Sequence, residues 1–206
     1  DVCSSDLTPL ANKSAYYGGQ IPWLRTQEVR FIDIHTTEIT ITELALRETS
    51  VKWIPENCVI VAISGATAGR SAINKIPLTT NQHCLCLQID HRKALYRYVF
   101  HWIYSNYEEL EALGQGARND LNSSIVKNFP IPVPPLAIQA EIVDILDRFD
   151  ALSALTDWVE KGVAPDRITV GATPANKEIP ANWSPERTRP LDRKSTRLNS
   201  SHANIS

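Results

Sequence analysis

The chain has 206 residues, of which 43% are hydrophobic and 21% are charged, and its formal net charge is −2. This composition is ordinary for a globular domain with an appendage, and it gives no indication of nucleic-acid binding. No apolar run approaches the ~18 residues of a membrane-spanning helix, and we see no secretory leader, so we expect a cytoplasmic protein that does not contact a membrane. The sequence contains no methionine, not even at position 1, and we therefore expect it to be a fragment.

The four cysteines are Cys3, Cys58, Cys84 and Cys86. They form no C-x-x-C pair, and two of them lie two residues apart inside an apolar run, which is the spacing of one strand face. We interpret them as reduced thiols of a cytoplasmic protein. The sequence therefore predicts no zinc site or other metal site, and no cofactor.

The first half of the chain predicts short strands and one small helix. Residues 21–29, IPWLRTQEV, begin with an extended apolar segment, and residues 29–34 alternate like a half-buried strand. Residues 42–49 are typical of a short helix that Thr42 caps. Residues 58–63, CVIVAI, form a continuous apolar run that predicts a strand buried on both faces.

A tight turn follows this central strand. Residues 64–70, SGATAGR, contain two glycines at positions 65 and 69, which favour a turn. The segment lacks the G-K-[ST] ending and the spacing of a phosphate-binding loop, so we do not expect it to bind nucleotides. Residues 71–76 and 83–89 predict two further strands.

The next elements are helical. Residues 93–114 carry apolar side chains at helical spacing and end at Gly114, which predicts one long helix. Residues 114–129, GQGARNDLNSSIVKNF, predict a polar loop that leads into a short helical turn. Asn119, Asn122 and Ser123 are candidates to cap that turn.

A ladder of prolines precedes the last predicted helix. Prolines occupy positions 130, 132, 134 and 135, and they favour a stiff extended segment that directs the helix away from what precedes it. The helix has apolar residues at steps of 4, 3, 4 and 3, the spacing of a coiled-coil seam. Packing of this helix on its own domain is the alternative. The predicted helix-pairing residues are Ile138, Ile142, Ile145, Phe149 and Leu152.

Both ends of the chain differ from its middle. Residues 192–206 are polar and without periodicity, and they resemble a translated sequencing-adapter read-through, as do residues 1–7. Residues 154–168 and 187–191 resemble the carboxyl-terminal segment of tannase and feruloyl esterase proteins, without any of that family's catalytic residues. We infer that unrelated coding pieces join near residues 149–155. Naturally irregular termini and a natural irregular extension are the alternatives.

The middle resembles the specificity subunit of type I restriction-modification systems. The matching stretches are IPWLRTQEV, ITELALRETSVKWIPENCVIVAISGATAGRSAI, TTNQHCLCL and GQGARNDLNSSIVKNFPIPVPPLAIQAEIVDILDRFDAL, in family order over about 130 residues. After Leu152 the sequence departs from the family pattern. In this family a target recognition domain is followed by a conserved spacer helix, and two such units in tandem pair their helices antiparallel.

The resemblance implies an α+β fold. We expect a mixed-sheet target recognition domain, a long projecting coiled-coil-type helix and an irregular C-terminal tail. The boundaries that we predict are a foreign leader at 1–7, the recognition domain at 8–135, the spacer and dimerisation helix at 136–160, and a foreign, disordered tail at 161–206. The implied partners are double-stranded DNA, the methyltransferase subunits and, through them, the restriction subunit.

Three polar clusters supply side chains of the types that contact DNA. Phosphate contacts give affinity and base-edge contacts give sequence preference, and Arg, Asn and Gln are the main base readers. We favour Arg118 as a base reader and Arg70 as a backbone anchor, whereas residues 79–82 are equally typical of a turn. The candidate DNA-binding residues are Arg25, Thr26, Thr67, Arg70, Lys75, Thr80, Asn81, Gln82, Gln115, Arg118 and Asn119.

The implied function is to read one half of a split DNA site. Residues 8–152 hold 13 basic against 15 acidic side chains, so we expect weak binding by one half alone. The sequence shows no catalytic constellation, and we expect the chain not to be an enzyme. Two alternatives stay open: a fragment of a tannase or feruloyl esterase hydrolase without its catalytic residues, and an assembly module that does not read DNA.

Overall fold

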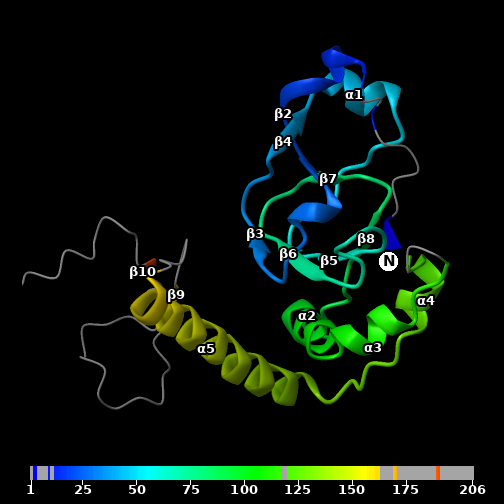
Figure 1. Cartoon of the computed structure of the whole chain (residues 1–206). Helices are drawn as coiled ribbons and strands as arrows, with labels where there is room; N and C mark the ends of the chain where they lie inside the picture. The colour runs from blue at the N-terminus through cyan, green and yellow to red at the C-terminus, as the bar shows by residue number, and fades with distance from the viewer. Residues whose placement is uncertain are drawn as a thin grey trace, which may run out of the picture. The chain divides into compact units, whose positions relative to one another are not determined.

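The computed structural model describes residues 2–3, 9, 12–116, 120–162, 169–170 and 189–190. The chain divides into two compact units, Asp1–Val143 and Asp144–Ser206. The first unit holds two sheets and most of the helices (Figure 1). No helix in these described ranges is long and apolar enough to cross a membrane.

A five-stranded sheet forms the centre of the first unit. Its order is β1 (Val2–Cys3), β8 (Cys84–Leu87), β5 (Val59–Ala62), β6 (Ser71–Asn74) and β3 (Asp33–Ile34). The central strand β5 pairs antiparallel with both of its neighbours, and β3 pairs parallel with β6. The strands expected within residues 58–63, 71–76 and 83–89 are therefore present in this sheet.

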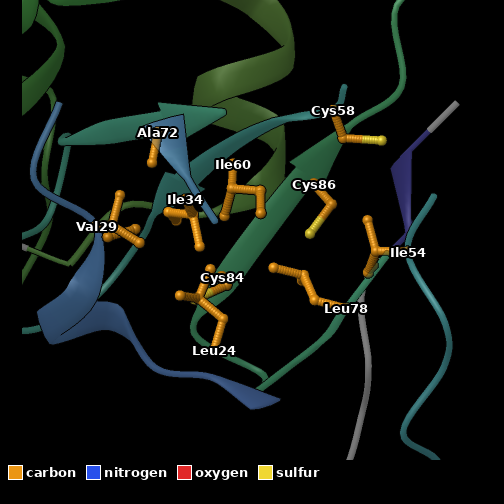
Figure 2. Packing of buried hydrophobic residues seen from close by; sticks show 11 residues of the cluster. Leu24, Val29, Ile34, Ile54, Cys58, Ile60, Ala72, Leu78, Cys84 and Cys86 are labelled. Atoms are coloured by element: carbon orange, nitrogen blue, oxygen red, sulfur yellow. The ribbon is translucent and has the colours of Figure 1, made fainter. Parts of the chain in front are cut away.

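Strand β5 is buried on both faces, as its continuous apolar run predicts. Ile60 and Ala62 lie in one core cluster, whereas Val59 and Val61 lie in another on the opposite face of the sheet. This alternation is the two-residue period of a strand. Figure 2 shows the first cluster, in which Leu24 and other apolar side chains gather around the Ile60 face of the sheet.

Three of the cysteines are core residues of the sheet. Cys58, Cys84 and Cys86 are buried and form no disulfide. Burial raises the pKa of the Cys84 thiol well above its usual value. These side chains therefore behave as small apolar groups, which agrees with the interpretation of them as reduced thiols.

A second, three-stranded sheet packs with a short helix. Its order is β4 (Ile39–Ile41), β2 (Tyr17–Leu24) and β7 (Thr79–Thr80), and two 3-10 turns, η1 (Ser14–Tyr16) and η2 (Thr26–Glu28), flank β2. Helix α1 (Glu43–Glu48) follows β4, and the Thr42 hydroxyl accepts a hydrogen bond from the Ala45 amide at 3.3 Å. The predicted helix and its cap are thus confirmed.

The strand predicted at residues 29–34 is wrong for most of its length, because only Asp33–Ile34 forms a strand. Phe31 has a φ of 62°, in the left-handed region that a strand cannot adopt. Its amide donates to the Ser71 carbonyl at 2.7 Å, and its ring packs against Tyr104 and Tyr107. These tertiary contacts override the local alternation of apolar residues.

Three helices cover the other face of the five-stranded sheet (Figure 1). They are α2 (Tyr96–Ser105), α3 (Tyr107–Ala112) and α4 (Ser123–Asn128). The single helix expected over 93–114 is interrupted at Asn106, whose side-chain amide donates to the Trp102 carbonyl at 2.8 Å. Asn122 is the cap of α4, where its side chain accepts from the Ile125 amide at 2.9 Å.

The last helix, α5 (Leu136–Lys161), confirms the long helix predicted after the prolines, and its role as a spacer stays a prediction. It continues through residues 149–155, where we expect two coding pieces to join. Beyond it, β9 (Thr169–Val170) pairs with β10 (Arg189–Pro190), and most of the predicted tail lies outside the described residues. The predicted foreign origins of residues 1–7 and 161–206 stay predictions.

The proline ladder is bound along its length by helix α2, and the prediction that it directs the last helix away from the body stays a prediction. The Tyr98 hydroxyl donates to the Pro132 carbonyl at 2.9 Å, and the Trp102 indole donates to the Pro130 carbonyl at 3.0 Å. Both donors belong to α2. Prolines lack an amide hydrogen but keep a carbonyl acceptor, and here helix α2 binds those acceptors.

We predict that Asn74→Ala lowers the free energy of unfolding by about 3 kcal/mol, because buried groups that lose a hydrogen-bond partner are costly. The buried Asn74 side chain accepts from the Cys58 amide and donates to the Pro55 and Ile76 carbonyls. Urea denaturation measures the change. The matched control Asn128→Ala removes an exposed amide that contacts Ser124, and should stay within about 0.5 kcal/mol of the parent. Equal effects of the two changes would contradict this account.

Candidate nucleic-acid interface

Three polar segments meet the glycine turn that follows β5. The Thr67 hydroxyl donates to the Thr26 carbonyl at 2.9 Å, and the Ile63 amide donates to the His83 carbonyl at 2.9 Å. The Leu121 amide donates to the Ile63 carbonyl, also at 2.9 Å. We call this surface the loop cluster and define it by residues 25–28, 63–70, 81–83, 115–116 and 120–122.

The glycine turn is fixed by its backbone. Gly69 has a φ of 84°, and its amide donates to the Ala62 carbonyl at 2.8 Å. A side chain at this position would be strained, and its Cβ would lie 3.1 Å from the Tyr107 ring. The turn therefore presents the neighbouring Thr67 and Arg70 side chains from a rigid support.

Arg70 follows the turn and is half-buried. Its Nε is buried and has no hydrogen-bond partner among the described residues. A buried donor without a partner is uncommon in folded proteins. Because this nitrogen is buried, any contact of Arg70 with a ligand would come from the terminal guanidinium nitrogens of this half-buried side chain.

Arg25 lies at the edge of the same cluster but is already paired. Its guanidinium lies 2.5 Å from the Glu38 carboxylate and 3.5 Å from Glu28. Glu28 is almost buried and accepts hydrogen bonds from the Arg25 amide at 3.2 Å and from the Glu38 amide at 2.8 Å. The carboxylate of Glu28 thus joins the end of β2 to the segment before β4, and it neutralises part of the Arg25 charge.

The segment 79–82 divides between core and surface. The Thr79 hydroxyl donates to the Pro22 carbonyl, and Thr80 is completely buried with its hydroxyl 4.0 Å from the Cys86 sulfur. Thr80 therefore cannot touch DNA in this structure. The Asn81 side chain accepts from the His83 amide at 3.1 Å and stabilises the turn, whereas Gln82 is exposed.

Lys75 lies outside the loop cluster. It is at the opposite end of β6 from Arg70, and the strand between them separates the two by about 16 Å. Its ammonium group donates to Asn57 at 3.1 Å and to the Tyr96 hydroxyl at 3.2 Å. The predicted grouping of Lys75 with Arg70 is therefore not what the fold produces.

The last segment, residues 115–122, closes the cluster. Gln115 is exposed and forms a backbone bridge with Asp120, whose carboxylate accepts from the Gly65 amide at 3.4 Å. Arg118 and Asn119, predicted to contact DNA, lie outside the described residues. Their roles stay predictions.

Sequence reasoning missed the carboxylates that organise this surface. Glu28 and Asp120 bind backbone amides of segments that are distant in sequence. The signal for Glu28 was its place three residues after Arg25, at the third position of a helical turn, where a carboxylate reaches back to the preceding amide. No comparable local pattern marks Asp120.

The predicted pairing residues on α5 are mostly exposed. Ile138, Ile145, Phe149 and Leu152 are 44–61% exposed, and Val159 extends the same stripe with 83% exposure. Ile142 is half-buried. An apolar stripe of this length at 4,3 spacing is a feature of helices that pair with another helix.

The chain matches the protein family described as Type I restriction modification DNA specificity domain over residues 1–161. It is 31% identical over 153 residues to the type I restriction enzyme EcoR124I/EcoR124II specificity subunit of Escherichia coli, covering 71% of this chain and 38% of the relative. It is 32% identical over 150 residues to the MjaIX specificity subunit of Methanocaldococcus jannaschii, covering 70% of this chain and 34% of the relative. The chain thus spans less than two-fifths of the length of these relatives.

Solved structures show the same fold. The crystal structure of the HsdS subunit from Thermoanaerobacter tengcongensis superposes with a TM-score of 0.59 at 17% identity, covering 78% of this chain and 37% of that one. A chain from a structure of a type I R-M system, described for its complex assembly and conformational transition, superposes with a TM-score of 0.62 at 17% identity, covering 79% and 38%.

We predict that Glu28→Gln lowers the free energy of unfolding by about 1–3 kcal/mol. The amide that replaces one carboxylate oxygen cannot accept from a backbone N–H, so one of the two bound amides loses its partner. Thermal or urea unfolding measures the change. Glu38→Gln is the matched control, because that carboxylate is 58% exposed and its ion pair contributes little. A Glu38 variant that is as unstable as the Glu28 variant would contradict this interpretation.

Proposed function

Because the chain belongs to the type I restriction modification DNA specificity domain family, we propose that its globular body binds one half of a split site in double-stranded DNA. The observation that carries this proposal is the loop cluster. Segments from three other parts of the chain meet the glycine turn there. Loops held by a rigid scaffold are where binding residues concentrate.

The side chains of the loop cluster fit the chemistry of DNA. Arg70 is a half-buried arginine next to the glycine turn, and Gln82 and Gln115 are exposed amides. Arginine binds phosphate or guanine, and glutamine binds adenine in the major groove. We propose Arg70 as the phosphate contact and the two glutamines as base readers, with Arg118 as a further reader.

We propose that the chain supplies recognition and that its partners supply the chemistry. In this proposal the methyltransferase subunits bind the chain, and the restriction subunit joins through them. The relatives are named as specificity subunits of restriction enzymes, which supports a recognition role. The proposed location is the cytoplasm, where the DNA of bacterial and archaeal cells lies.

We propose that the exposed stripe of α5 pairs with a second spacer helix. A helix rises ~1.5 Å per residue, so a pair of such helices sets the separation between two recognition bodies. In solutions of this chain alone the second helix is that of another copy. The same stripe also favours the alternative that the chain is an assembly module that reads no DNA. A measurement of DNA binding distinguishes this alternative from the recognition role.

DNA binding by the full chain tests the proposal. We predict that Arg70→Ala weakens binding to short duplexes of any sequence and flattens the dependence of log affinity on log salt by about one unit, because one phosphate contact is lost. Fluorescence anisotropy at low salt measures both quantities. Lys75→Ala is the matched control, since Lys75 lies at the other end of β6 and should leave the salt slope unchanged.

Two outcomes would contradict the DNA proposal. A parent chain that binds no duplex, with or without methyltransferase subunits of a relative, leaves only the assembly role. A Lys75 variant that loses as much affinity as the Arg70 variant would place the contact surface away from the loop cluster.

Self-association tests the helix stripe. We predict that Phe149→Asp weakens self-association of the full chain at least tenfold, because pairing would bury a charge in the apolar seam. Analytical ultracentrifugation at micromolar concentration measures it. Ala140→Asp is the matched control: residue 140 is exposed and lies nine residues away, on the opposite side of the helix from Phe149. A parent chain that remains monomeric would refute pairing between copies.

A further inference from the structure

The beginning of α5 contains a buried polar side chain that the proposed function does not use. Gln139 is completely buried, whereas its neighbours Ile138 and Ala140 are exposed. Its carbonyl oxygen accepts from the Leu95 amide at 2.9 Å. Its amide group donates to the Lys93 carbonyl at 3.2 Å and to the Pro134 carbonyl at 2.7 Å. Both ends of the side chain are therefore occupied by backbone groups.

These contacts join two helix beginnings. Leu95 is the N-cap residue of α2 and has no side-chain cap of its own. The first amides of a helix lack partners within the helix, and Gln139 supplies one from an element 44 residues further along the chain. The same side chain holds the Pro134 carbonyl just before α5 begins. One residue thus caps α2 and anchors the start of α5.

The proline ladder extends this anchor along α2. Tyr98 and Trp102 lie one turn apart on α2 and donate to the Pro132 and Pro130 carbonyls. Burial raises the pKa of the Tyr98 phenol above its usual value, so the hydroxyl keeps its proton and remains a donor. Three carbonyls of the ladder, at residues 130, 132 and 134, are therefore bound, and the prolines restrict the backbone between them.

We propose that Gln139, with Tyr98 and Trp102, forms a joint that fixes the first turns of α5 to the recognition body. We call these side chains the Gln139 joint. Gln139 acts in it as a positioning residue, because it touches backbone and not DNA. The consequence for DNA reading rests on the proposed function: a fixed joint defines where the spacer helix starts relative to the base-reading loops.

Residual dipolar couplings of the full chain test the joint without DNA. In the parent, the amide couplings of α2 and of residues 136–143 should fit one alignment tensor. Gln139→Met keeps the length of the side chain but removes all three hydrogen bonds. We expect the couplings of residues 136–143 to fall below half their parental values, while those of α2 and β5 keep theirs. Hydrogen exchange of the Leu95 amide should accelerate at least tenfold.

Two further variants make the result decisive. Gln82→Met, at an exposed turn, is the matched control and should leave all couplings unchanged. Tyr98→Phe removes one hydroxyl of the joint, and it should reduce the couplings of residues 136–143 to a smaller extent. If Gln139→Met does not fold, Tyr98→Phe decides.

The proposal would be overturned if the folded Gln139→Met variant kept the parental couplings of residues 136–143. If that variant does not fold, the same result in Tyr98→Phe would overturn it. A chain that fails to bind DNA would leave this test intact, so the two proposals fail separately.

Discussion

Both faces of the five-stranded sheet are buried. Polar side chains of this sheet can therefore reach solvent only at the ends of its strands. Val59 and Val61 pack towards the helices, and Ile60 and Ala62 pack in the first core cluster, which Figure 2 shows. Burying a polar group in either core would cost free energy unless it were fully hydrogen-bonded. The polar loops therefore gather at strand ends, and the turn after β5 becomes their meeting point because β5 is the central strand of the sheet.

The need of buried polar groups for hydrogen-bond partners also explains how the body connects to α5. A proline-rich segment has few donors of its own, so its carbonyls need donors from elsewhere if they lie against the body. Tyr98, Trp102 and Gln139 provide those donors. An extended segment that is stiff in itself and bound along its length loses little further entropy when a partner binds. The stiff segment that the prolines predict is thus bound along α2 and is not free.

Patterns within one element were predictable from the sequence, and contacts between elements were not. The apolar run of β5, the Thr42 cap and the heptad of α5 each depend on neighbouring residues, which a sequence displays directly. The break at Asn106 lies inside a stretch whose apolar residues keep helical spacing, and the left-handed Phe31 is held by tertiary contacts. In the sequence, Gln139 cannot be told from a surface glutamine, because its partners Leu95 and Lys93 lie 44 and 46 residues away.

Charge determines how a body of this kind can hold DNA. Acidic side chains outnumber basic ones in residues 8–152, and the Arg25 charge is compensated by Glu28 and Glu38. Since non-specific affinity comes from phosphate neutralisation, the proposed binding of DNA by one body would be weak, and the proposal assigns much of the sequence preference to neutral amides such as Gln82 and Gln115. Two weak half-site contacts become strong when they are tethered, because the second contact forms at high effective concentration. That gain is lost if the tether cannot hold both bodies on their half-sites, so the proposed helix pairing and the Gln139 joint would set affinity as well as spacing.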